Sequence, residues 1–169
     1  LKQTRSEKYL NRNINQNPIY EEILRMDISL NDKDAARHHA RQLLHSDPNN
    51  WLANYALGSL ALNVGELVEA EDYLQHSLDS NESLIALNDL AYTKYLLRKM
   101  KEAETLIRRG IELDKNLYVL WDTYGCIKLS ARDFDEAEIY LKRSIQLFDG
   151  DLRPHLHLAQ VYYNTQRYD

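Results

Sequence analysis

The segment WDTYGCIKLSARDFDEAEIYLKRSIQLFD at residues 121–149 has helix-like periodicity on both sides of a short polar turn. Apolar residues recur at steps of three and four, for example at Phe134, Ala137 and Leu141 after the turn. Such steps place side chains on one face of an α-helix. The segment therefore predicts two amphipathic helices joined by residues 131–133.

The same pattern recurs along the chain. Glu-Ala-Glu triplets begin at residues 69, 102 and 136, so the spacings are 33 and 34 residues. A period of this length indicates a repeat array, in which each unit buries its apolar face only by stacking on its neighbours. The predicted units are 17–50, 51–83, 84–117 and 118–151, followed by an incomplete unit at 152–169 and preceded by a polar linker or frayed helix at 1–16.

Each unit is predicted to be an antiparallel pair of helices with small residues where the two helices cross. Large side chains there would hold the axes further apart than the usual separation of about 8–10 Å. The small residues are Gly58, Ala91, Gly125 and Ala159 on first helices, and Ala36, Ala70, Ala103 and Ala137 on second helices. The expected helices are 17–30, 33–46, 51–64, 67–79, 84–97, 100–113, 118–131, 134–147 and 152–165. The predicted fold class is all-α.

The composition agrees with a helical, acidic protein. Only 5 glycines and 3 prolines occur in 169 residues, and the formal net charge is −5. An acidic surface does not attract nucleic acid or anionic membranes, so neither is expected as a partner. No run of eighteen apolar residues occurs, so no membrane insertion is expected. The chain begins with leucine and has no signal peptide, so we expect a piece of a longer protein, either cytoplasmic or periplasmic.

With this repeat pattern the chain resembles the tetratricopeptide repeat (TPR) family. The match is best at residues 118–151, with Trp121, the Tyr124-Gly125 pair, Phe134, Ala137 and Leu141. The runs at 87–92 and 121–125 also look like those of bacterial multi-repeat proteins. This resemblance implies a right-handed superhelical solenoid and a non-catalytic scaffold that binds a peptide or protein element on its concave face. It implies no cofactor.

The resemblance implies that first helices line the concave face. The candidate partner-binding residues are Tyr55, Ser59, Asn88, Asp89, Tyr92, Tyr95, Asp122, Thr123, Cys126, His157 and Gln160. TPR domains that bind a carboxylate need converging lysines and arginines, but here Asp89 and Asp122 occupy the centre. The residues therefore favour a neutral or basic segment of a partner.

Metal binding and catalysis are not expected from the spacing of the histidines and of the single cysteine. His38 and His39 are adjacent, as on diverging sides of a helix, and no common metal-binding motif occurs. Cys126 has only His157, one repeat away, as a conceivable base, and the sequence does not support that geometry. The glutamates flanking each buried alanine are expected to form a solvent-facing rim.

Two other functions stay open. The array could be the targeting arm of an enzyme whose catalytic domain lies outside this chain, or a module for homo-oligomerisation. The latter follows from the incomplete last unit, because a first helix without its mate is expected to expose Leu158, Val161 and Tyr162.

Overall fold

The computed structural model describes residues 17–167, and all secondary structure in this range is helical. The helices are α2 (Asn17–Ser29), α3 (Lys33–Ser46), α4 (Trp51–Val64), α5 (Leu67–Ser80), α6 (Leu84–Leu96), α7 (Met100–Leu113), α8 (Tyr118–Ser130), α9 (Phe134–Leu147) and α10 (Leu152–Thr165). The predicted helices are confirmed to within one residue at each end. The linker expected at residues 1–16 lies outside the described part of the chain. None of the helices in residues 17–167 has the length and apolar character needed to cross a bilayer.

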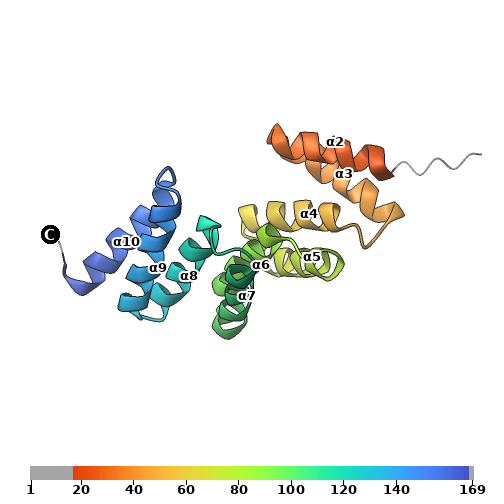
Figure 1. The fold of residues 1–169 in the computed structure, drawn as a ribbon. Coiled ribbons are helices and arrows are strands. Elements are labelled where there is room, and N and C mark those ends of the chain that lie inside the picture. Colours follow the sequence, from red (N-terminus) through yellow and green to blue (C-terminus); the bar gives the residue numbers. More distant parts are fainter. Residues whose placement is uncertain (1–16, 168–169) are drawn as a thin grey trace, which may run out of the picture.

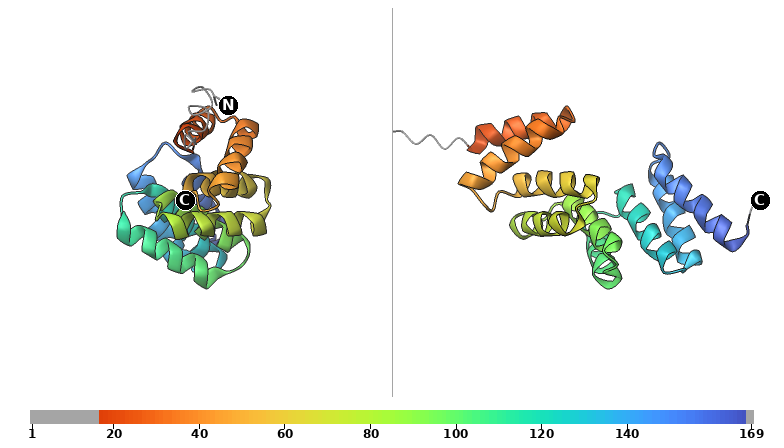
Figure 2. Two further views of the ribbon diagram at one scale, coloured as in Figure 1. Left: turned by 90° about the vertical axis from the view of Figure 1, so that its right-hand side faces the viewer. Right: turned by 180° about the vertical axis from the view of Figure 1, so that it is seen from behind.

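The helices form an elongated right-handed superhelix of antiparallel pairs, in the order α2–α3, α4–α5, α6–α7, α8–α9 and then α10 (Figures 1 and 2). Each second helix packs on the first helix of the next pair. First helices of successive pairs also touch one another, whereas within residues 17–167 second helices of successive pairs do not. The layer of first helices therefore lies on the inner side of the curve, and we call the surface of α4, α6, α8 and α10 the inner face.

Small residues set the distance between the two helices of a pair. Ala70, Ala103 and Ala137 have no exposed surface. A Cβ atom added at Gly125 would lie 2.5 Å from Cγ of Leu141, and one added at Gly58 would lie 2.7 Å from Cγ of Leu74. Both separations are shorter than van der Waals contact, so the predicted need for small residues is confirmed at Gly58 and Gly125. It does not hold at Ala159, which is exposed.

Substitution of Gly125 by alanine tests this packing. Because Leu141 is fully buried, Gly125→Ala forces a shift in the core and should lower the free energy of unfolding by about 1–3 kcal/mol. Ala159 is the matched control, since it holds the same place in the last unit but is exposed. Ala159→Leu should change stability by less than about 0.5 kcal/mol in urea titrations. Equal effects of the two substitutions would contradict the packing argument.

The turns between paired helices share one backbone feature. The first or second residue after each first helix has a positive φ angle, at Asn31, Gly65, Arg98, Arg132 and Gln166. These positions recur every 33 or 34 residues, and a left-handed residue is a common way to end a helix. Glycine is the residue that adopts this conformation without strain, so the non-glycine turns carry a local cost.

The Glu-Ala-Glu triplets differ from expectation. Four of their six glutamates form ion pairs with two lysines of first helices, and each lysine thereby connects successive pairs. Lys94 on α6 forms ion pairs with Glu71 of the preceding pair and Glu102 of its own pair. Lys128 on α8 repeats this arrangement with Glu104 at 3.3 Å and Glu136 at 2.7 Å.

The expectation of a solvent-facing rim holds for Glu69 and Glu102, which are exposed, but not for Glu71. The Lys94 and Lys128 side chains are only 11% and 13% exposed, and that of Glu71 is 18% exposed. The alternation of glutamates around alanine could not reveal this burial, because the lysine stems that cover them come from a different helix. The triplets help to join one pair to the next.

Removing Lys94 should therefore weaken the contact between the pairs α4–α5 and α6–α7 in a pH-dependent way. Burial opposes ionisation of Glu71, but hydrogen bonds from Lys94 and Lys99 outweigh it and lower the pKa of Glu71 from its usual 4.5. A carboxylate with a lowered pKa stabilises the fold above its unfolded-state pKa, and that stability disappears as pH falls through the folded-state pKa.

Lys94→Met keeps the apolar stem and should cost about 1–2 kcal/mol at pH 7. The loss should shrink below pH 4.5. Urea unfolding at several pH values measures both effects. Lys101→Met is the control, because Lys101 is exposed and forms no ion pair among the described residues. A pH-independent loss would contradict the ion-pair explanation.

Candidate partner-binding face

The candidate residues all lie on the four helices of the inner face. Tyr55 and Ser59 belong to α4, and Asn88, Asp89, Tyr92 and Tyr95 to α6, whereas Asp122, Thr123 and Cys126 belong to α8, and His157 and Gln160 to α10. Their exposure differs strongly. Asp122, Thr123 and Cys126 are buried, at 7%, 5% and 6% exposure. Tyr92 is 38% exposed and Gln160 is also exposed.

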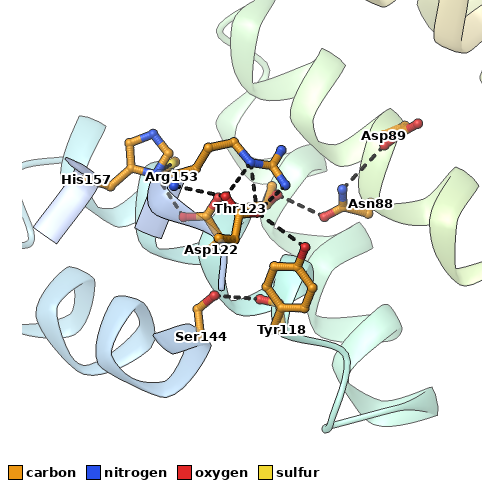
Figure 3. Close-up of polar contacts among 10 residues, drawn as sticks. Asn88, Asp89, Tyr118, Asp122, Thr123, Ser144, Arg153 and His157 are labelled. Atoms are coloured by element: carbon orange, nitrogen blue, oxygen red, sulfur yellow. Dashed lines mark hydrogen bonds and ion pairs between the residues drawn. The ribbon is translucent and has the colours of Figure 1, made fainter. Parts of the chain in front are cut away.

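A row of polar contacts joins three of the first helices. Tyr55 lies within hydrogen-bonding reach of Asp89 and Ser59. On the other side of α6, the Thr123 hydroxyl donates to the side-chain oxygen of Asn88 over 2.8 Å, as seen in Figure 3. These groups are occupied in holding first helices together, so they are less available to a partner than their sequence positions indicate.

The next contact in this row is the Asp122–Cys126–His157 cluster. His157 Nδ1 lies 2.8 Å from Oδ1 of Asp122 and 3.2 Å from Sγ of Cys126 (Figure 3). The sequence did not support a contact between Cys126 and His157, but the structure places the two side chains next to each other. It also corrects the view of Asp122 as a free carboxylate of the groove.

The cluster does not have the geometry of a catalytic triad. In a triad the nucleophile and the carboxylate contact different nitrogens of the imidazole ring. Here Cys126 and Asp122 both face Nδ1 of His157. Burial, together with the negative charge of Asp122, raises the pKa of the Cys126 thiol. A protonated thiol is a poor nucleophile, so this arrangement does not favour covalent chemistry.

Two histidines differ from the surface residues that the sequence suggested. His157 is 31% exposed, and His39 forms a 2.7 Å contact with Asp27 at 24% exposure. His39 lies on α3 and Asp27 on α2, so this pair connects two helices of the first unit. A helical spacing rule applied to one helix at a time does not detect such contacts.

The apolar surface of α10 also differs from expectation. Val161 is fully buried, and Leu158 packs with it against α9. Leu152, Leu156 and Tyr163 are the exposed apolar residues of this helix, at 74%, 68% and 70%. The predicted stripe of Leu158, Val161 and Tyr162 is therefore wrong, because that side of α10 faces the preceding pair.

The accessible surface of α6 on the inner face is aromatic and apolar. The rings of Tyr92 and Tyr95 lie 5.7 Å apart. Ile85 and Leu96, on the same helix, are 54% and 36% exposed. These side chains provide a surface that can bury apolar groups of a partner.

A cavity of about 270 Å³ lies at the C-terminal ends of the first helices. Its lining contains Tyr95, Arg98, Ser130, Arg132, Gln160 and Asn164. Sequence reasoning identified Tyr95 and Gln160 here but missed the two arginines, because they follow the helices instead of belonging to them. Their recurrence next to the polar turn was the available signal.

The charge at the centre of the face depends on Asp89. Burial raises the pKa of Asp89 to about 6, although hydrogen bonds from Asn88 and Tyr55 and the charge of Arg153 act in the opposite direction. Burial and Asp89 in turn raise the pKa of Tyr55 to about 12. Asp89 consequently loses its charge when the pH falls to about 6, but it is still largely ionised at pH 7.

Asp89→Asn should reveal this shift. Because the folded-state pKa lies above the usual 3.8, the folded state binds the proton more tightly, and ionisation destabilises the fold as pH rises through 6. The variant should be more stable than the parent above pH 6, by about 1 kcal/mol or more. The two should converge below pH 4. Parallel urea titrations across this range measure the difference, and a variant that is less stable at pH 7.5 would refute the assignment.

Comparison with known proteins agrees with this architecture. The family model of the tetratricopeptide repeat matches residues 28–84. A search of curated proteins finds no match. A crystal structure of MamA is 20% identical with a TM-score of 0.72, and the alignment covers 90% of this chain and 84% of MamA.

Two further solved structures have similar scores. YrrB, "a TPR protein with an unusual peptide-binding site", is 18% identical with a TM-score of 0.72 over 98% of this chain and 86% of its own. PilF of Pseudomonas aeruginosa is 18% identical with a TM-score of 0.74 over 91% and 71%. The chain therefore has the fold of a tetratricopeptide-repeat array, and the family model itself matches residues 28–84.

Proposed function

We propose that this chain is a protein-interaction scaffold whose inner face binds an extended segment of a partner protein. The observation that carries the proposal is the exposure of Tyr92, beside the half-buried Tyr95, on a face formed by first helices of successive pairs. Aromatic residues are enriched at the energetic centres of protein interfaces. The peptide-binding site of YrrB, which has a similar fold, supports a peptide as the form of the ligand.

The chemistry of the face favours an uncharged, partly apolar segment, with a basic one next in preference. Exposed Ile85, Tyr92 and Leu96 can cover apolar side chains. Asp122 is buried against His157, and Asp89 is partly buried and hydrogen-bonded by Asn88 and Tyr55, so neither carboxylate is freely available to a partner. An acidic segment is disfavoured, because its negative charges would lie close to both of these carboxyl groups.

Selection from a random peptide library tests the proposal directly. Peptides that bind the parent chain should be largely uncharged and should lose at least about tenfold in affinity for Tyr92→Ala and Tyr95→Ala, because truncating a hot-spot residue costs more than 1 kcal/mol. Val68→Ser and Ile139→Ser are matched controls, since these residues are 74% and 63% exposed on second helices. They should leave affinity unchanged.

Two outcomes would contradict the proposal. Selected peptides could bind the tyrosine variants normally but lose affinity for the variants on α5 and α9, which would place the interface on the outer helices. Alternatively, an acidic peptide could bind more tightly than its charge-reversed counterpart, which would refute the preference for neutral or basic segments.

A further inference from the structure

The Asp122–Cys126–His157 cluster has the form of a metal site. Asp122 and Cys126 are four residues apart on α8 and so share one side of that helix, and His157 reaches them from α10. Their ligand atoms all lie within 4.8 Å of one another. Two of the three residues are buried, so the atoms are held by the packing of two helices.

All three groups have hydrogen-bond partners, but one proton at the ring nitrogen has to serve two neighbours. Nδ1 of His157 is the atom that faces both the thiol and the carboxylate. If Nδ1 carries a proton, it can donate to Asp122, and the thiol then has no acceptor on the ring. If Nδ1 is unprotonated, it can accept from Cys126, and Asp122 loses its donor. A cation at their centre would interact favourably with all three atoms.

The donor set identifies the class of cation. A thiolate, an imidazole and a carboxylate are the ligand types of zinc, with bonds of about 2.3 Å to sulfur and about 2.0–2.2 Å to nitrogen and oxygen. Tetrahedral bonds of these lengths place ligand atoms roughly 3.3–3.6 Å apart. The observed separations of 3.2 and 2.8 Å are shorter than this range, so the ligand atoms would have to move apart by up to about 0.5 Å to bind the ion. A thiolate and a carboxylate would also neutralise the two positive charges of Zn²⁺.

We propose that Asp122, Cys126 and His157 bind one Zn²⁺ ion on the inner face, with water as the fourth ligand. Small movements of His157 complete the geometry. Among the described helices, α10 packs only on α8 and α9, so it can shift by a few tenths of an ångström without disturbing other pairs. The proposal stands apart from peptide binding, because it concerns a resident ion and can be tested without a partner.

Arg153 is the neighbouring charge that opposes a cation here. Its positive charge favours the thiolate form of Cys126 and acts on Asp122 as well. The guanidinium is paired with Asp151, however, with Nη2 2.6 Å from Oδ2. Removing this charge should strengthen zinc binding, which gives the proposal a variant with an effect in the opposite direction.

The experiment uses the 169-residue chain without an affinity tag, stripped of metal by a chelator. Zn²⁺ is titrated against a competing chromophoric chelator, and Co²⁺ is added separately as a spectroscopic probe. The parent chain should bind one equivalent of each ion and melt at higher temperature with zinc. Cobalt should give a thiolate-to-metal charge-transfer band, which exposed histidines alone cannot produce.

Variants assign the ligands. Cys126→Ser should abolish the charge-transfer band. Cys126→Ser and His157→Gln should each weaken zinc binding more than the loss of an outer-shell partner, which typically costs about 10–100-fold in affinity. His155→Gln is the matched control, since His155 lies two residues from His157 and contacts Asp149 instead. It should bind normally, and Arg153→Gln should bind more tightly.

The parent chain decides the question even if a variant does not fold, which circular dichroism will detect. Absence of stoichiometric zinc binding, or cobalt binding without a thiolate band, overturns the proposal. Unchanged affinity in folded Cys126→Ser or His157→Gln protein overturns it as well.

Discussion

The close crossing of the two helices within each pair is the constraint on which this structure depends. Leu74 and Leu141 fill the space directly against Gly58 and Gly125, and neither leucine has exposed surface. A pair that cannot close to this distance presents a different surface to the next pair. Since each second helix packs on the following first helix, an error in one crossing would change the position of every later first helix on the inner face.

Polar contacts between pairs then fix the register that apolar packing leaves open. Lys94 and Lys128 each connect glutamates of two successive pairs. Within single pairs, buried Ser77 and Ser144 make another repeated contact, each donating over 2.9 Å to the carbonyl of the first residue of its own pair, Trp51 or Tyr118. Hydrogen bonds of this kind are directional, so they select one rotation of each helix about its axis.

The sequence was sufficient to predict the helices and the buried small residues, because both follow from periodicity along a single chain. It was insufficient for contacts between repeats, which depend on how far each pair turns relative to the last. Asn88 meets Thr123, and Asp122 meets His157, each across 35 residues. This separation is one period plus one residue. A search for chemically complementary residues at that offset would have found both contacts, and through His157 the metal-ligand cluster.

The remaining departure from local preference lies at the turns. Gly65 satisfies the left-handed conformation, whereas Arg98 and Arg132 adopt it with φ angles of 64° and 62°, at a cost of about 1 kcal/mol or more each relative to glycine. The fold does not require arginine there, since a glycine serves the same turn in an earlier repeat. Both arginines line the cavity that contains Tyr95 and Gln160. Residues that depart from local backbone preferences are often found at functional sites. The positions of these two arginines therefore support a binding role for the end of the inner face where the cavity lies.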